Sequence, residues 1–186
     1  FQLLLARQLL KSMHLWPVLA GSKWLADRMV FRLDDVAAPP ELAWSPAAVA
    51  IAYSVMFFLA WDVSRYLLHR LMHEVPALWE LHQVHHSAEV LTPLTFHRVH
   101  PIESLLYQIR GILVTGIVAG GFFWCFRYDG VGWTLFGVHA IGLVCNVATG
   151  NLRHSHLWLR FPEKVERWLV SPAQHQLHHS ADPAHY

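Results

Sequence analysis

The sequence predicts an all-α, integral-membrane helical bundle. Hydrophobic residues make up 54% of the 186 residues and charged residues only 15%, whereas an average soluble domain has roughly 25% charged residues. Long stretches carry no charge at all, and histidine occurs fifteen times. The formal net charge of +1 gives no reason to expect a nucleic acid as partner. We therefore expect a membrane protein whose function depends on imidazole side chains.

The first part of the chain, about residues 1–38, is expected to form a helix that lies in the membrane interface. Arg7, Lys11 and His14 recur at helical spacing among leucine, phenylalanine and methionine residues, a pattern typical of interfacial helices. A peripheral helix that packs on the bundle would have the same pattern, so both interpretations remain open. Pro39-Pro40 separates this helix from the next one.

Three charge-free windows predict membrane-spanning helices at about residues 43–62, 108–127 and 131–150. Twenty uncharged residues lie between Glu41 and Asp62, and twenty-three lie between Asp129 and Arg153; a spanning helix needs about 20. The middle window has sixteen residues, and the arginines at its ends can extend to the headgroups. A short polar turn joins the last two windows, which predicts a helical hairpin. The alternative is a soluble all-α protein with very apolar core helices.

Counting the passes through the membrane predicts which loops share a side. The first helix crosses once and the hairpin crosses out and back, so residues 62–110 and 150–186 are expected on one face. These two segments hold eight Lys and Arg residues, against six in the rest of the chain, and this excess favours the cytoplasmic side. No repeat or linker is visible, so we expect a single membrane domain over residues 1–186, which we treat as part of a longer chain.

Histidine is concentrated in the two segments that the topology places together. Twelve of the fifteen histidines fall in residues 69–100 and 154–179. Asp62, Tyr66, His69 and His73 are spaced so that their side chains share one narrow stripe of a helix. Two His-x-x-His-His boxes follow, formed by His82, His85 and His86 and by His175, His178 and His179. Positions i, i+3 and i+4 bring three imidazoles to one helix face, as neighbouring ligands of a metal require.

These patterns predict a histidine-rich metal-binding cap on one membrane face, built from the box regions 62–103 and 150–186, with His154 as a further candidate. One box alone has a simpler explanation as an exposed helix face, but two boxes and a stripe do not. The imidazole nitrogens exceed one coordination sphere, so two ions are expected. Neither the Glu-x-x-His pair of carboxylate-rich di-iron sites nor His-Glu-x-x-His occurs. Imidazole suits zinc, copper, iron and nickel, so the ligands alone do not identify the metal.

Five segments occur in a recognisable order along the chain. They are Asp62-x-x-x-Tyr66-x-x-His69-Arg70-x-x-His73, Trp79-x-x-His82-x-x-His85-His86-Ser87, Arg98-x-His100-Pro101-x-Glu103, His154-Ser-x-Leu and Pro172-x-x-His175-x-x-His178-His179-Ser180. With this set the chain, from about residue 43 to its end, resembles the fatty acid hydroxylase / sterol desaturase superfamily of integral-membrane di-iron oxygenases. The resemblance implies an O2-dependent oxidase that hydroxylates or desaturates an aliphatic C–H bond of a fatty acyl chain, a sterol or a related lipid.

The resemblance also implies the cofactors and partners. These are two Fe ions, with zinc possible in purified protein, O2 as co-substrate, a lipid substrate from the bilayer, and a cytochrome b5-like or ferredoxin/reductase electron donor. The implied metal ligands are His69, His73, His82, His85, His86, His154, His175, His178 and His179. Two features differ from the family pattern: His156 stands where asparagine is usual, and the sequence stops at Tyr186, before the Asn-Tyr-Gly and Trp-Asp elements that usually follow the last box.

Four further residues are candidates for an extra ligand or for a partner that holds a ligand in place: Asp62, His100, Asn151 and His156. Asp62 is expected to orient a ligand imidazole through its second N–H, with an ion pair to Arg65 as the alternative. His100 has an equally good alternative role in stabilising a turn.

Two other functional classes fit parts of the pattern. A histidine-rich membrane metal-binding or transport protein should place ionisable ligands inside its spanning windows. The only histidine in these windows is His139. A di-zinc membrane hydrolase is chemically possible, but such sites generally use carboxylates as bridge or base. The sequence therefore favours the oxidase.

Overall fold

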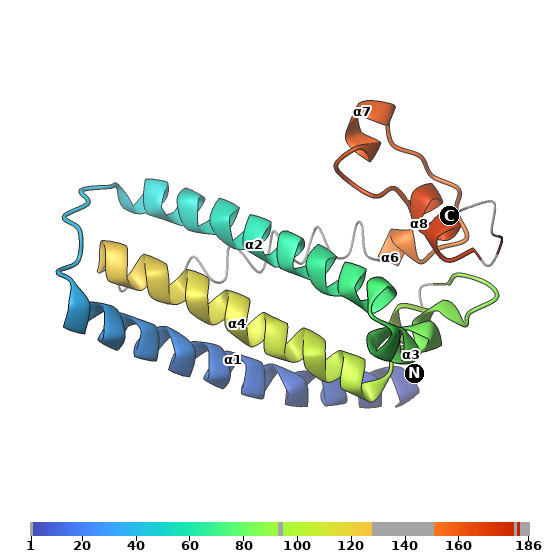
Figure 1. Ribbon diagram of the computed structural model, residues 1–186, viewed down its shortest axis with the longest axis horizontal. Helices are drawn as coiled ribbons and strands as arrows, with labels where there is room; N and C mark the ends of the chain where they lie inside the picture. The colour runs from blue at the N-terminus through green and yellow to red at the C-terminus, as the bar shows by residue number, and fades with distance from the viewer. Residues whose placement is uncertain (1, 93–94, 128–150, 181, 183–186) are drawn as a thin grey trace. The chain divides into compact units, whose positions relative to one another are not determined.

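The computed structural model describes residues 2–92, 95–127, 151–180 and 182, with the backbone alone at residues 2–16, 96 and 151 (Figure 1). Its helices are α1 (Gln2–Val36), α2 (Pro46–Glu74), α3 (Pro76–His86), η1 (Thr95–His97), α4 (Pro101–Phe126), α6 (Asn151–Arg153), α7 (Glu163–Glu166) and α8 (Pro172–His178). No strand occurs in these ranges, and the predicted all-α fold is confirmed. The predicted span 131–150, with His139, lies outside the described residues.

The chain divides into two compact units. The first comprises Phe1–His69 and Leu105–His139, and the second comprises Arg70–Ser104 and Ala140–Tyr186. The first unit therefore contains the long helices, and the second contains both histidine boxes. That the whole chain is one membrane domain stays a prediction.

Small residues allow the long helices of the first unit to pack closely side by side (Figure 1). Ala26 of α1, Tyr53 and Phe57 of α2, and Ala119 of α4 form the buried core. Tyr53 is fully buried, because its ring stacks on Phe57 at 6.0 Å between centroids and meets the edge of Phe122 at 5.2 Å. Aromatic packing of this kind contributes beyond simple area burial.

Helix α1 coincides with the helix expected at about residues 1–38. The helix continues through Pro17 to Val36 and packs against α4, where Gly21 faces Ile112 and Leu25 faces Gly116. At the other end, Arg127 donates to the carboxylate of Asp34 at 3.1 Å and so links the ends of α4 and α1. Its location in a membrane interface stays a prediction.

Two of the three predicted spans coincide with helices long and apolar enough to cross a membrane, α2 and α4. Only 17% and 28% of their most apolar windows are buried, and Ile51, Val55 and Ile117 are each more than half exposed. Side chains of this kind suit contact with acyl chains. Both helices extend beyond the predicted limits, α2 to Glu74 and α4 back to Pro101, because polar residues that end a charge-free window do not end a helix.

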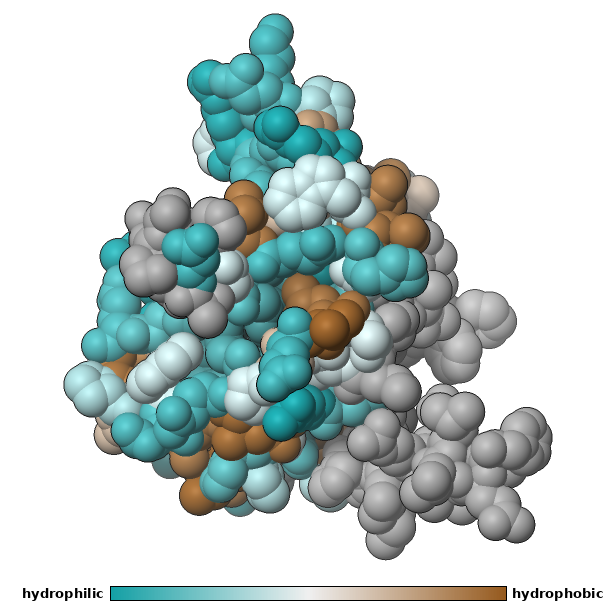
Figure 2. All heavy atoms as spheres, turned by 90° about the vertical axis from the view of Figure 1, so that its right-hand side faces the viewer, coloured by the Kyte–Doolittle hydropathy of each residue, from teal (hydrophilic) through white to brown (hydrophobic). Residues whose placement is uncertain are grey.

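Exposed apolar side chains also occur outside α2 and α4, as at Phe31 of α1 and at Trp168 before α8. Figure 2 shows a face on which hydrophilic residues predominate and hydrophobic residues form separate patches between them.

The contact between α1 and α4 predicts opposite effects for two neighbouring glycines. A Cβ at Gly116 would lie 2.8 Å from Leu25 Cβ, whereas a Cβ at Gly121 would lie 3.9 Å from Met29 Cε. Glycine to alanine gains up to about 1 kcal/mol in helix propensity, but overpacking costs about 1–3 kcal/mol. We expect Gly116→Ala to lower the thermal unfolding midpoint in detergent and Gly121→Ala to leave it equal or higher. Equal midpoints in both variants would contradict this packing.

Candidate metal centre

Helix α2 carries the first two predicted ligands beyond its apolar part. His69 and His73 are four residues apart on the unbroken helix, so they share one face. Only Val75 separates α2 from α3, and Pro76 begins α3, since proline is favoured at the first position of a helix. The first histidine box, which begins at His82, follows on α3.

Eight of the nine predicted ligands form two groups of four, and in each group the potential ligand atoms lie within 4.8 Å of one another. The α2–α3 group consists of His69, His73, His82 and His86. The α8 group consists of His85, His154, His175 and His179. His69 ends the N-terminal segment of the first unit, and the continuous helix places it one turn before His73.

Each histidine box divides its side chains in the same way. From the first box, His82 and His86 enter the α2–α3 group while His85 enters the α8 group. The second box sends its own i and i+4 residues, His175 and His179, into the α8 group. Its i+3 residue, His178, packs against His73 and His86 of the α2–α3 group.

The ring of His178 therefore adjoins the α2–α3 group. Its centroid lies 4.6 Å from that of His73 and 4.8 Å from that of His86. The two groups are also in direct contact, because His86 and His179 stack with centroids 4.2 Å apart. All nine histidines thus form one continuous cluster, as the predicted pair of ions requires.

Ligand nitrogens converge in the α8 group. His154 Nε2 lies 3.1 Å from His85 Nε2 and 3.0 Å from His175 Nε2. Two nitrogens bound to one ion at about 2.1 Å are about 3.0 Å apart at a right angle and about 3.4 Å apart at a tetrahedral angle. The observed separations match those of nitrogens that share one ion.

Hydrogen bonds on the far side of two rings fix which nitrogen faces each group. His82 Nδ1 lies 2.9 Å from Glu103 Oε1, and His85 Nδ1 lies 3.3 Å from the carbonyl oxygen of Arg98. Each oxygen accepts a hydrogen bond from Nδ1–H, so the proton stays on Nδ1 and the lone pair is on Nε2. A hydrogen bond of this kind orients a ligand imidazole and sets its tautomer.

Burial keeps His85, His86 and His179 of the two boxes neutral. Desolvation, followed by repulsion from His154 and His82, lowers the pKa of His85 to about 4. Desolvation, followed by repulsion from His179, lowers the pKa of His86 as well. Desolvation, followed by repulsion from His85, lowers the pKa of His179 to about 2. A metal ion binds the neutral ring, so these side chains are ready to bind at neutral pH without releasing a proton.

Unsatisfied nitrogens show that the cluster fits metal ions. His86 Nε2 and both ring nitrogens of His179 are buried and have no hydrogen-bond partner. A buried polar atom without a partner is costly, and a metal ion removes that cost for imidazole nitrogens. The donor set is imidazole alone, which suits transition metals such as iron, zinc or copper.

The fatty acid hydroxylase family model matches residues 54–186, more than half of the chain. The chain belongs to the fatty acid hydroxylase family. One curated relative is the Delta(7)-sterol 5(6)-desaturase of Eremothecium gossypii, which is 40% identical over 63 residues. These residues are 33% of this chain and 18% of the desaturase, so the match spans less than a fifth of that relative's length. No solved structure matches the chain significantly.

Membership in the fatty acid hydroxylase family confirms the resemblance on which the ligand set was based. The two helices long and apolar enough to cross a membrane agree with a membrane protein. The match begins at Ser54, within α2, and includes every described histidine of the cluster.

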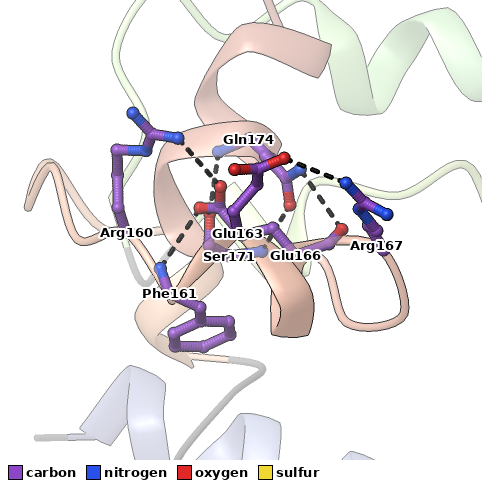
Figure 3. A network of polar contacts seen from close by, with 7 residues as sticks. All are labelled: Arg160, Phe161, Glu163, Glu166, Arg167, Ser171 and Gln174. Atoms are coloured by element: carbon purple, nitrogen blue, oxygen red, sulfur yellow. Dashed lines mark hydrogen bonds and ion pairs between the residues drawn. The ribbon is translucent and has the colours of Figure 1, made fainter.

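The second box of this fatty acid hydroxylase family member is held by a polar network ahead of α8 (Figure 3). Ser171 and Gln174 form a capping box: Ser171 Oγ accepts from Gln174 N, and Gln174 Oε1 accepts from Ser171 N at 3.0 Å. Ser171 Oγ also donates to Glu166 Oε1 at 2.6 Å, and Glu166 accepts from Arg160 and from Phe161 N. The Ser171 hydroxyl and then Arg160 lower the pKa of Glu166.

This network predicts the effect of removing one hydroxyl. Ser171→Ala deletes the cap of α8 and one hydrogen bond to Glu166, and loss of such a cap costs about 1 kcal/mol. Since α8 carries His175, we expect a lower unfolding midpoint together with weaker metal retention, measured by thermal denaturation and elemental analysis. Ser87→Ala, which removes an exposed serine at the end of α3, is the matched control. A normal midpoint in Ser171→Ala would show that the cap does not hold α8.

The structure places three of the four additional candidates away from the two groups. Asp62 is exposed on α2, seven residues or about 10 Å before His69. His156 is exposed in the turn after α6. His100 Nδ1 accepts from Ile102 N at 3.2 Å, so it has the turn-stabilising role at the start of α4. Asn151 begins α6, and its side chain lies outside the described residues.

Glu103, rather than Asp62, lies beside a predicted ligand imidazole. It is 2% exposed and lies within hydrogen-bond distance of a ligand imidazole. The residue appears in the segment Arg98-x-His100-Pro101-x-Glu103, but no periodicity connects it with His82. The sequence feature that could have identified Glu103 is its position: it is an acidic residue two positions after a proline that begins an apolar helix.

Proposed function

We propose that the protein is an O2-dependent di-iron lipid oxidase, a hydroxylase or desaturase that acts on an aliphatic C–H bond of a fatty acyl chain, a sterol or a related lipid. The proposal depends above all on the two groups of four histidines, between which the first histidine box is divided. That arrangement provides two adjacent all-imidazole positions. Family membership supplies the chemical class.

The metal ligands in this proposal are the two groups and His178, which adjoins the α2–α3 group. With iron bound, the pair would use O2 and two electrons to oxidise an aliphatic carbon. The chain's own residues hold the ligand nitrogens inward. Glu103 and the Arg98 carbonyl hold His82 and His85 through Nδ1, so each ring presents Nε2 to the cluster.

The α8 segment completes this arrangement. Gln176 donates to the carbonyl oxygens of Ser155 and Leu157 at 3.0 and 2.9 Å, which ties α8 to the turn that carries His154. His154 and His175 therefore keep their short Nε2 separation. Neutral rings leave the positive charge of the ions uncompensated, which suits an electrophilic oxidant.

The lipid substrate and the electron donor follow from the membrane location. The exposed apolar faces of α2 and α4 suit acyl chains, so we propose that the substrate comes from the bilayer. A cytochrome b5-like protein or a ferredoxin/reductase system would supply electrons from the aqueous side. We propose that this is the cytoplasmic side, on the basis of the Lys and Arg distribution.

The proposal is tested with the full protein reconstituted in lipid, loaded with iron, and supplied with O2 and a reductant. We expect mass spectrometry of the extracted lipids to show a product that has gained one oxygen atom or lost two hydrogen atoms. With ¹⁸O2, the gained oxygen in an alcohol product carries the label. Hydrolysed lipid in the absence of O2 would instead indicate a di-zinc hydrolase and would overturn the oxidase.

A further inference from the structure

The carboxylate of Glu103 is almost completely buried next to a metal ligand. Glu103 is 2% exposed and His82 is 1% exposed, and Oε1 lies 2.9 Å from Nδ1. The second oxygen, Oε2, is buried with no hydrogen-bond partner among the described residues. A buried charge is costly unless something compensates it, so its presence here calls for a function.

The start of α4 explains part of this compensation. Glu103 is the acidic residue in the first turn of this 26-residue helix, where the helix dipole favours a negative charge. The other part would come from a cation on the far side of His82. A carboxylate, an imidazole and a metal ion in line form an arrangement in which each member stabilises the next.

His85, which belongs to the same box as His82 but to the α8 group, has a different acceptor. The ring of His85 is held by the neutral carbonyl oxygen of Arg98, at the longer distance of 3.3 Å. Hydrogen bonds to a charged acceptor are shorter and roughly twice as strong as those to a neutral one. The first histidine box therefore supplies one carboxylate-bound ring to the α2–α3 group and one carbonyl-bound ring to the α8 group.

We propose that Glu103 strengthens cation binding at the α2–α3 group and not at the α8 group. This inference rests on the metal pair of the proposed function. Glu103 is a positioning residue that acts through His82, a member of the α2–α3 group. It sets the tautomer of that ring and adds one negative charge near the ion.

The two positions can be measured separately in the full-length protein. His154→Ala removes a ligand of the α8 group and leaves the α2–α3 position, whereas His73→Ala does the reverse. Glu103→Gln keeps an oxygen that accepts from His82 Nδ1 but removes the charge. Zn²⁺ affinity is measured in each background by competition with a chromophoric chelator. Loss of a partner of a ligand histidine typically costs 10–100-fold in metal affinity, so an effect of about that size is expected.

We expect Glu103→Gln to weaken Zn²⁺ binding about 10–100-fold in the His154→Ala background and to leave it unchanged in the His73→Ala background. Glu89→Gln, which removes an exposed acid in the same unit, is the control for net charge and should change neither. Equal weakening at both positions, or none at the α2–α3 position, would overturn the inference. Failure of the unsubstituted protein to bind Zn²⁺ would instead count against the metal pair of the proposed function.

Discussion

Replacing His154 with alanine is expected to lower the metal content of the purified protein from about two ions per chain to about one, and to abolish lipid oxidation. His154 Nε2 is the shared neighbour of His85 Nε2 and His175 Nε2, at 3.1 and 3.0 Å. Without it, the α8 group loses its central nitrogen, and alanine offers no replacement donor. The metal content is measured by elemental analysis, and the oxidation by mass spectrometry of the lipids.

The matched control for this prediction is two residues away. His156 is exposed and belongs to neither group, so His156→Ala should retain about two ions per chain and full activity. Loss of metal in His156→Ala would make it an extra ligand, the alternative that the sequence left open. Full metal content in His154→Ala would contradict the α8 group as a metal position.

The sequence predicted the members of the cluster better than their grouping. Spacings of i, i+3 and i+4 place His82, His85 and His86 on one side of a helix, and this was interpreted as one set of neighbouring ligands. Residues 85 and 86 are about 100° apart around the helix axis, so adjacent histidines point to different centres. The division becomes visible only when α8 brings the second box beside the first, which is a tertiary contact.

Glu103 and Asp62 show why the supporting carboxylate was misassigned. Asp62 shares the stripe of His69 and His73, so local periodicity selected it, but two turns of helix separate it from the ligands. Glu103 is twenty-one residues from His82, and no periodic pattern links residues across a turn and a 3₁₀ helix. Two of the three predicted spans coincide with long apolar helices, because the apolar windows depend on local composition alone. A hydrogen bond between two elements depends on how they pack, which local composition does not predict.

The metal-free protein is expected to lose stability steeply as the pH falls from about 6.5 to about 4. In the unfolded chain a histidine has a pKa of about 6.5, whereas burial lowers the pKa of His85 to about 4 in the folded protein. Within this interval the unfolded state binds protons and the folded state does not, so acidification favours unfolding. Above about pH 7 both states are neutral and the effect disappears. Thermal unfolding midpoints of metal-free protein across this range measure the profile.

Removing one buried histidine tests the cause of this acid sensitivity. His85→Gln should flatten the profile between about pH 4 and 6.5 by up to one proton, or about 1.4 kcal/mol per pH unit, while His156→Gln should leave it unchanged because that ring is exposed. Bound Zn²⁺ should move the acid transition to lower pH, because protons must then displace the ion from neutral rings. A profile equally steep in His85→Gln would show that His85 does not contribute to the acid lability, and that its low pKa matters for metal binding alone.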